Sequence, residues 1–111
     1  VSVGDGQVNI KLAAEHVFCT AESRASILLR GGTVKVVAFA NTGGIVDLAD
    51  YDVSEASVTA NTNGKIIVYP KQKIEGKVNT AGEIICHPNI PQYQLTKGFG
   101  GIITRRNRPT R

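Results

Sequence analysis

Apolar and polar residues alternate along much of the chain, which is the pattern of β-strands that bury one face. The stretch that starts at Gly64 reads GKIIVYP, and the stretch that starts at Gly82 reads GEIICHP. In both, apolar residues stand two and four places after the glycine. No long stretch repeats its apolar residues at the 3.6-residue interval of a helix. The alternation therefore predicts an all-β protein.

The same alternation returns at a nearly fixed interval. Three turns of similar sequence, NTGG, NTNG and NTAG, occupy residues 41–44, 61–64 and 79–82. Extending the pattern in both directions gives anchors at residues 6, 25, 44, 64, 82 and 100, which are 19, 19, 20, 18 and 18 residues apart. A turn formula that recurs in this way indicates one structural unit repeated along the chain.

A second apolar pair follows most anchors after 11 and 13 places. The pairs are Val17 and Cys19, Val36 and Ala38, and Tyr93 and Leu95, whereas Val58 and Val78 each lie 14 places on. Each unit has room for two short strands and two turns, and none for a helical crossover. We therefore predict that residues 4–104 form a single-stranded parallel β-helix, a solenoid of about six coils of 18–20 residues.

Stacked coils place equivalent residues in ladders about 4.8 Å apart. The apolar residues two places after the anchors predict one inward ladder, whose members are Val8, Ile27, Val46, Ile66, Ile84 and Ile102. In the last unit Thr104 takes the second inward position, four places after the anchor. Asn and Gly are expected to supply positive φ at the corners, and Asn41, Asn61 and Asn79 to stack as a polar ladder. Lys65 and Glu83 are predicted neighbours on the outer face.

An antiparallel β-sandwich with hairpins is the alternative fold, because short strands and frequent turns suit it too. A sandwich does not require the same apolar positions to recur every 19 residues, whereas in this chain they do recur at about that interval. The first coil starts almost at Val1 without a capping segment, so we expect a longer domain whose upstream coils cover that edge. The chain has neither an initial Met nor a leader, which we interpret as a mature or trimmed form.

Composition narrows the class of protein further. The 111 residues suffice for one domain, and 5% aromatic residues with no Trp or Met suit stacked aliphatic strands. The net charge of +4 comes entirely from four arginines in residues 105–111, because residues 1–103 hold nine basic and nine acidic side chains. We expect residues 105–111 to be a solvated basic tail, with weak phosphate binding as the alternative. No apolar run is long enough to span a membrane.

The chain also carries a family resemblance, which covers residues 40–104 well and residues 4–39 loosely. The stretch DLADYDVSEASVTANTNGKIIVYPKQKIEGKVNTAGEIICHPNIP, followed by KGFGG, is similar to the C-terminal half of the head GIN domain family of auto-transporter adhesins. The matching places are Leu48 to Val53, Gly64 to Ile66, Ile74 to Val78, Gly82 to Ile84, Pro91, and Gly98 to Gly100. The chain departs from the family at residues 85–91, where ICHPNIP replaces an aromatic pair and a Gly-x-Pro step.

The resemblance implies a right-handed parallel β-helix in secreted or lipid-anchored envelope proteins of Gram-negative bacteria. It implies no catalytic residue. The residue pattern itself also contains no phosphate-binding loop, nucleophile elbow or Ser/His/Asp spacing.

The two cysteines and two histidines are the first candidates for chemistry. Cys19 and Cys86 fall on different strands four coils apart, on the order of 19 Å along the axis, which is too far for a disulfide. We expect both to be free and buried. His16 and His87 lack the converging ligands of a zinc site, and His87 is expected to be exposed beside the buried Cys86.

Three acids, Asp47, Asp50 and Asp52, cluster in DLADYD. Calcium requires six or more oxygen ligands, so we expect a solvated corner rather than a metal site. No catalytic, cofactor-binding or metal-binding residue is assigned on these grounds.

The leading hypothesis is a non-enzymatic extracellular or cell-envelope module that presents a flat strand face to surface glycans or to host or envelope proteins. Nucleic acid is not an expected partner, because the body of the chain carries no net charge. A second hypothesis is a structural protein that self-assembles through exposed coil ends. A third is a calcium-dependent enzyme that acts on polysaccharides.

Overall fold

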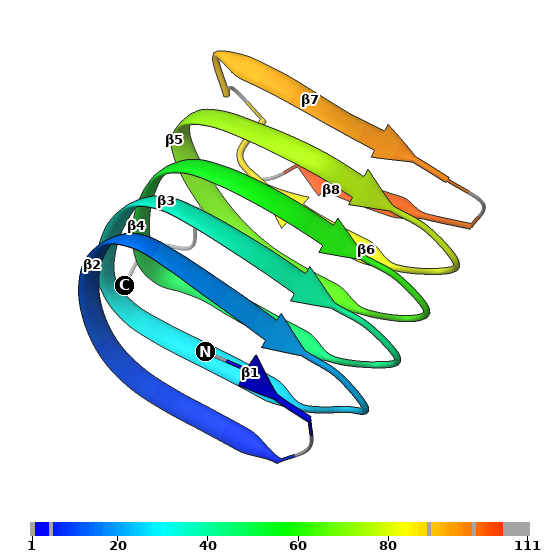
Figure 1. The fold of residues 1–111 in the computed structure, drawn as a ribbon. Coiled ribbons are helices and arrows are strands. Elements are labelled where there is room, and N and C mark those ends of the chain that lie inside the picture. The colour runs from blue at the N-terminus through cyan, green and yellow to red at the C-terminus, as the bar shows by residue number, and fades with distance from the viewer. Residues whose placement is uncertain (1, 5, 89, 99, 106–111) are drawn as a thin grey trace.

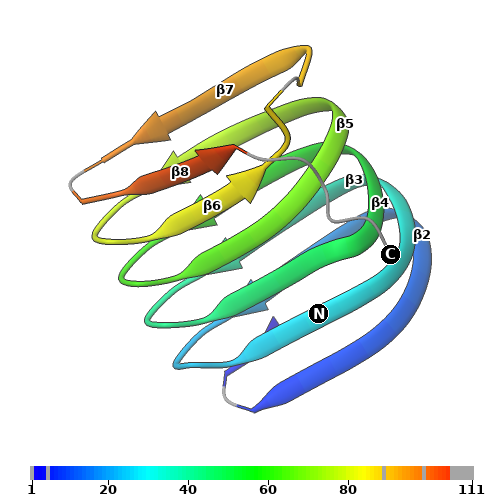
Figure 2. The same ribbon diagram turned by 180° about the vertical axis from the view of Figure 1, so that it is seen from behind.

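Every element of the described chain is a β-strand, and the strands wind into a solenoid of about five turns (Figures 1 and 2). The computed structural model describes residues 2–4, 6–88, 90–98 and 100–105. The strands are β1 (Ser2–Val3), β2 (Gln7–Ala21), β3 (Ser26–Ala40), β4 (Ile45–Ala60), β5 (Lys65–Val78), β6 (Glu83–Cys86), β7 (Gln92–Lys97) and β8 (Ile102–Arg105).

All strand pairs are parallel, in the order β1-β2-β3-β4-β5-β6-β8, with β7 also paired to β5. Val46 pairs with Ile66, and Ile66 pairs with Ile84, so equivalent residues of successive coils are direct neighbours. The parallel solenoid is therefore confirmed, and the antiparallel sandwich is excluded.

Most coils differ from the prediction in how their two strands are connected. The two short strands of a unit are joined into one curved strand of 14–16 residues in β2 to β5, and they separate only in the coil of β6 and β7. Each coil thus has a first arm, a rounded bend, a second arm and a four-residue corner. The first arms are 7–10, 26–29, 45–48, 65–68, 83–86 and 102–105, and the second arms are 16–21, 35–40, 55–60, 73–78 and 92–97.

The inward ladder of the first arms is nearly as predicted, but its last member is wrong. Ile103, not Ile102, pairs with Ile84, while Ile102 pairs with Glu83 and is 52% exposed. The last corner ends at Gly101, one residue later than the anchor that the sequence pattern indicated. Thr104 consequently lies on the outer face rather than in an inward slot.

The second arms contribute three inward ladders. They are Val17, Val36, Ala56, Ile74 and Tyr93; Cys19, Ala38, Val58, Gly76 and Leu95; and Ala21, Ala40, Ala60 and Val78. Val58 and Val78 belong to different ladders, although both stand 14 places after an anchor. The ladder next to the corner is mostly Ala, and larger side chains predominate in the ladder farthest from the corner.

The corner is a type I′ turn, in which both central residues have positive φ. Thr62 and Asn63 have φ values of 49° and 66°, and the Gly64 N–H donates to the Asn61 carbonyl at 2.9 Å. The expectation that Asn and Gly supply the positive φ is confirmed at the third position of two corners, where Gly43 and Asn63 have φ values of 80° and 66°. It is wrong for the Asn that begins and the Gly that ends the corner, because neither has a positive φ. Gly64 is required for another reason: a Cβ there would overlap the carbonyl oxygen of Ala40 in the preceding coil.

Backbone hydrogen bonds continue through the corners from one coil to the next. The Gly43 N–H donates to the Thr62 carbonyl at 3.0 Å, and the Asn63 N–H donates to the Thr80 carbonyl at 3.1 Å. The predicted asparagine ladder is present in part, since Asn79 Nδ2 donates to Asn61 Oδ1 at 3.2 Å. These bonds hold a β-branched residue at a φ that it would otherwise avoid.

The C-terminal coil is tied together by Arg105, the last residue of β8. Its guanidinium lies over the ring of Tyr93 in β7, 4.7 Å from the ring centroid, which is a cation–π contact. The remainder of the expected basic tail, residues 106–111, lies outside the described residues.

Candidate binding surfaces

The outer face of the second arms is a regular sheet surface, seen side by side along the axis in Figure 1. Alternate residues of each arm point outward because side chains alternate along a strand. Along the sheet, these residues are His16, Phe18 and Thr20; Lys35, Val37 and Phe39; Glu55, Ser57 and Thr59; Lys73, Glu75 and Lys77; and Gln92, Gln94 and Thr96. The face is apolar toward β2 and charged toward β5.

The apolar part of this face, which we call the apolar patch, consists of Phe18, Val37 and Phe39. Phe18 is 67% exposed and Phe39 is 40% exposed, and Phe18 pairs in register with Val37. A shallow hollow of about 340 Å³ lies beside Phe18 and Val37, with His16 and Lys35 at its rim. Large apolar side chains grouped on a soluble surface are characteristic of an interaction site.

The charged part of the face is locally neutralised. Lys73 Nζ lies 3.7 Å from Glu75 Oε2, and Lys35 and Glu55 occupy paired positions in β3 and β4. A small polar hollow of about 110 Å³ lies among these four side chains. Alternating charges of this kind favour solubility and contribute little to stability.

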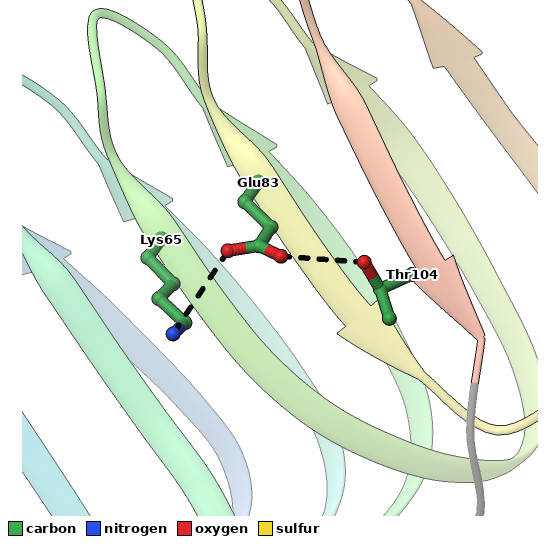
Figure 3. A network of polar contacts seen from close by, with 3 residues as sticks. All are labelled: Lys65, Glu83 and Thr104. Carbon is green, nitrogen blue, oxygen red and sulfur yellow. Dashed lines mark hydrogen bonds and ion pairs between the residues drawn. The ribbon is translucent and has the colours of Figure 1, made fainter.

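The first arms carry a smaller polar cluster on the opposite side (Figure 3). Lys65 Nζ lies 3.9 Å from Glu83 Oε1, which confirms the predicted pair, and Thr104 Oγ1 donates to Glu83 Oε2 at 3.2 Å. The three residues lie on β5, β6 and β8 and link successive coils. Their partial exposure identifies them as a surface contact that supports the register.

A third hollow runs along the stacked corners, and we call it the corner hollow. Its volume is about 800 Å³ and it is open to solvent. The lining residues are Glu22, Ser23, Asn41, Thr42, Asn61, Thr62, Asn79 and Thr80. All of them are polar, and Glu22 is the single charged residue of this lining.

Both cysteines are free and buried, on different ladders of the core. Burial raises the pKa of the Cys19 thiol to about 11, slightly opposed by the positive N-terminus. Burial likewise raises the pKa of the Cys86 thiol to about 11, opposed by the charge of Arg105. Neither thiol is a nucleophile near neutral pH, because the thiolate is the reactive form.

The histidines are far from a shared site. His16 is exposed on the outer face of β2, and the ring of His87 packs on Tyr69 with centroids 4.8 Å apart. His87 is therefore half-buried rather than exposed as expected, although Cys86 beside it is buried. Within residues 2–4, 6–88, 90–98 and 100–105, no three His, Cys, Asp or Glu side chains converge to hold a metal ion.

The acidic residues of DLADYD lie in β4, not on a corner. Asp47 Oδ1 accepts a hydrogen bond from the Ala49 N–H at 3.0 Å, which shapes the entry to the bend. Asp52 is exposed at the bend, and the side chain of Asp50 lies outside the described residues. These acids therefore lie on a curved strand and not at the solvated corner that the sequence predicted.

Sequence reasoning missed both candidate surfaces. Phe18 stands between the inward-facing Val17 and Cys19, and Phe39 stands between the inward-facing Ala38 and Ala40. Strand alternation alone could have placed both rings outside. The corner hollow required knowledge that the Asn-Thr turns stack in register, which parallel pairing supplies.

The family model described as "Putative auto-transporter adhesin, head GIN domain" matches residues 1–89, which is most of the chain. A search of curated proteins and a search of solved structures each gave no match. No helix in the described part of the chain is long and apolar enough to cross a membrane.

Proposed function

Because the chain belongs to the head GIN domain family of auto-transporter adhesins, we propose that it is a non-enzymatic adhesion module that makes contact through its apolar patch. The observation that carries this proposal is the exposure of Phe18 and Phe39 on one side of a regular sheet. Aromatic side chains contribute large contact areas and are enriched at binding sites.

The surroundings of the patch suit a binding role. Its backbone belongs to β2 and β3, which pair in register over both arms, so little order has to be gained on binding. Polar groups, including His16 and Lys35, lie at the rim and can provide specificity. The family description supports an extracellular or cell-envelope location. Surface glycans and host or envelope proteins are the partners we propose, with the module exported and secreted or lipid-anchored.

An immobilised array of glycans and extracellular-matrix proteins tests this role. The fluorescently labelled domain is expected to bind a small set of probes, and Phe18→Ser with Phe39→Ser is expected to weaken that binding at least tenfold. Ile102→Ser is the matched control, since Ile102 is also an exposed apolar residue but lies on β8. Equal binding by the double variant and the control would contradict the assignment of the patch, and silence on every probe would contradict adhesion.

A second candidate function is axial self-assembly. Within the described residues, β1 pairs with β2 at Thr20 and Ala21, so the backbone of residues 7–17 forms a sheet edge at one end of the solenoid. Such an edge accepts another parallel strand. Sedimentation velocity over a 100-fold concentration range should then show growing assemblies, whereas a monomer at every concentration would exclude this function.

A further inference from the structure

We propose that the corner hollow binds an unbranched, uncharged glycan that lies along the solenoid axis. This inference deepens the proposed adhesive role by naming a ligand class, and it rests on that role. It uses a different surface from the apolar patch, so the two can fail separately.

The first argument is the chemistry of the lining. Asn41, Thr42, Thr62 and Thr80 make no side-chain hydrogen bond within the described part of the chain, so their amide and hydroxyl groups are available to a ligand. Amides and hydroxyls both donate and accept, as do the hydroxyl groups of a sugar. With Glu22 at one end as the single charge, the lining does not favour a polyanion such as nucleic acid.

The second argument is the spacing. The corners are in register, so each type of side chain recurs at the strand separation of about 4.8 Å. An extended β-1,4-linked sugar chain advances by a similar distance per sugar, and each sugar is turned over relative to its neighbours. Alternate sugars would therefore meet equivalent groups on alternate coils, and several weak contacts would add up along one chain.

The third argument is preorganisation. Each of the lining corners is closed by its own hydrogen bond, for example Gly82 N–H to Asn79 carbonyl at 2.9 Å, and is bonded to a neighbouring corner through the backbone. The bond from Asn79 Nδ2 to Asn61 Oδ1 fixes the orientation of two amides in the row. A fixed row of donors and acceptors avoids the entropy cost of ordering flexible side chains on binding.

The test is titration of the ¹⁵N-labelled protein with β-1,4-linked glucose oligomers, followed by NMR. The expected shifts are confined to the side-chain amides of Asn41, Asn61 and Asn79 and to the backbone of the corners. A hexamer is expected to bind at least tenfold more tightly than the disaccharide. The α-1,6-linked hexamer, which holds no straight repeat, is expected to bind more weakly than the β-1,4-linked one.

Two substitutions at one position give the matched comparison. Thr62→Val removes the hydroxyl but keeps a β-branched side chain at the same φ, and it should weaken hexamer binding roughly three- to tenfold. Thr62→Ser keeps the hydroxyl and should bind within about twofold of the native protein. Thr59→Val, on the sheet face outside the hollow, should leave the affinity unchanged. Thermal melts of each variant confirm that it folds.

The outcomes separate the two proposals. Shifts outside the corners, equal affinity for hexamer and disaccharide, or no loss with Thr62→Val would overturn the glycan site. If the hexamer causes no shifts while array binding still depends on Phe18 and Phe39, the glycan site is wrong and the adhesive patch stands. If hexamer binding persists in the Phe18→Ser, Phe39→Ser variant, the corner hollow acts independently of the patch.

Discussion

The corner and the bend of each coil both reverse the chain, but they do so under opposite constraints. Each corner between β2 and β6 has four residues, positive φ at its two central positions and a backbone hydrogen bond to a neighbouring corner. The bend has no fixed length: the register shifts between Leu28 and Gly31 and again between Leu48 and Val53. The variation of coil length therefore lies in the bend.

This difference shows where a repeat is enforced. At the corners that follow β3, β4 and β5, the preceding coil lies so close that a Cβ at the last position, Gly44, Gly64 or Gly82, would overlap its backbone. At the bend, a curved strand accepts an added or missing residue as a bulge. Sequence periodicity is consequently strict at the corner, where an added Cβ would overlap the neighbouring backbone, and loose at the bend, where the register shifts.

Glycine substitutions test the difference between corner and bend, and they are expected to give the largest change in stability. Gly64→Ala places a Cβ on the carbonyl oxygen of Ala40, which belongs to a paired strand and cannot move alone, so we expect a loss of about 3 kcal/mol or more in unfolding free energy. Gly32→Ala, at the bend, meets its nearest atom, Asp52 O, at 3.4 Å and should change stability by less than about 1 kcal/mol. Urea denaturation measures both, and similar losses would refute the distinction.

The corner also explains why the fold could be predicted. Asn-Thr-x-Gly recurs because its geometry is shared by all coils, and the parallel pairing of Val46, Ile66 and Ile84 follows from it. The continuous strand through the bend could not be predicted, because bends such as ADYD and YPKQ share no residue pattern. The prediction that Ile102 points inward is wrong by one residue for a similar reason. The last corner, GFGG, contains three glycines, and the sequence alone does not show that the corner ends at Gly101.

The buried thiols provide the next test, since Cys19 lies two residues before the strand end at the corner and Cys86 lies at the entry to a bend. Each pKa rises from 9.0 to about 11 on folding. The raised pKa means that stability is intact below pH 9 and is lost as the pH rises toward 11, because the unfolded chain releases the thiol proton first. Each loss should be on the order of 2 kcal/mol.

Urea denaturation at pH 7, 9, 10 and 11 measures this loss. Other groups also titrate in the same range, so Cys19→Ala and Cys86→Ala provide the reference. Each variant should lose less stability between pH 9 and 11 than the native protein does. A native profile that is flat over this range, or unchanged in slope in both variants, would show that the thiols are not protected by the core.

Two adjacent isoleucines after the last corner test where that corner ends, and the expected change in stability is smaller. Ile103 is partly buried against the core, whereas Ile102 points outward from the same strand. Ile103→Ala should cost about 1 to 2 kcal/mol, below the range for a fully buried isoleucine, and Ile102→Ala should cost less than about 0.5 kcal/mol. Thermal denaturation distinguishes them, and the reverse order would restore the anchor at residue 100.

The candidate surfaces were less predictable than the fold for a different physical reason. An inward residue has to be apolar, so the core pattern appears in the sequence, whereas an outward residue is not constrained to one class. Phe18 and Phe39 are therefore recognisable only after the strand phase is known. The corner hollow depends in addition on coils being in register, since Asn41 and Asn61 are 20 residues apart in sequence.

The smallest effect is expected at the bend, where Tyr51 is fully buried and its hydroxyl has no hydrogen-bond partner among the described residues. Burial raises the pKa of this phenol and the Cys19 thiol adds to the rise, whereas the nearby Thr33 hydroxyl, which makes no hydrogen bond to the phenol, lowers it. Thr33 Oγ1 itself donates to the Glu15 carbonyl at 3.0 Å. The bend thus tolerates an unpaired polar atom, whereas the corner's backbone groups are bonded coil to coil.

Tyr51→Phe removes that atom without changing the packing of the ring. Because an unpaired buried hydroxyl is costly, its loss should leave stability unchanged or raise it by up to about 1 kcal/mol in urea denaturation. Thr33→Val at the neighbouring buried position is the control and should be destabilising, since it leaves the Glu15 carbonyl without the bond from Thr33. A loss of more than about 1 kcal/mol in Tyr51→Phe would mean that the phenol is bonded in solution, and that the bend satisfies its polar groups as fully as the corner does.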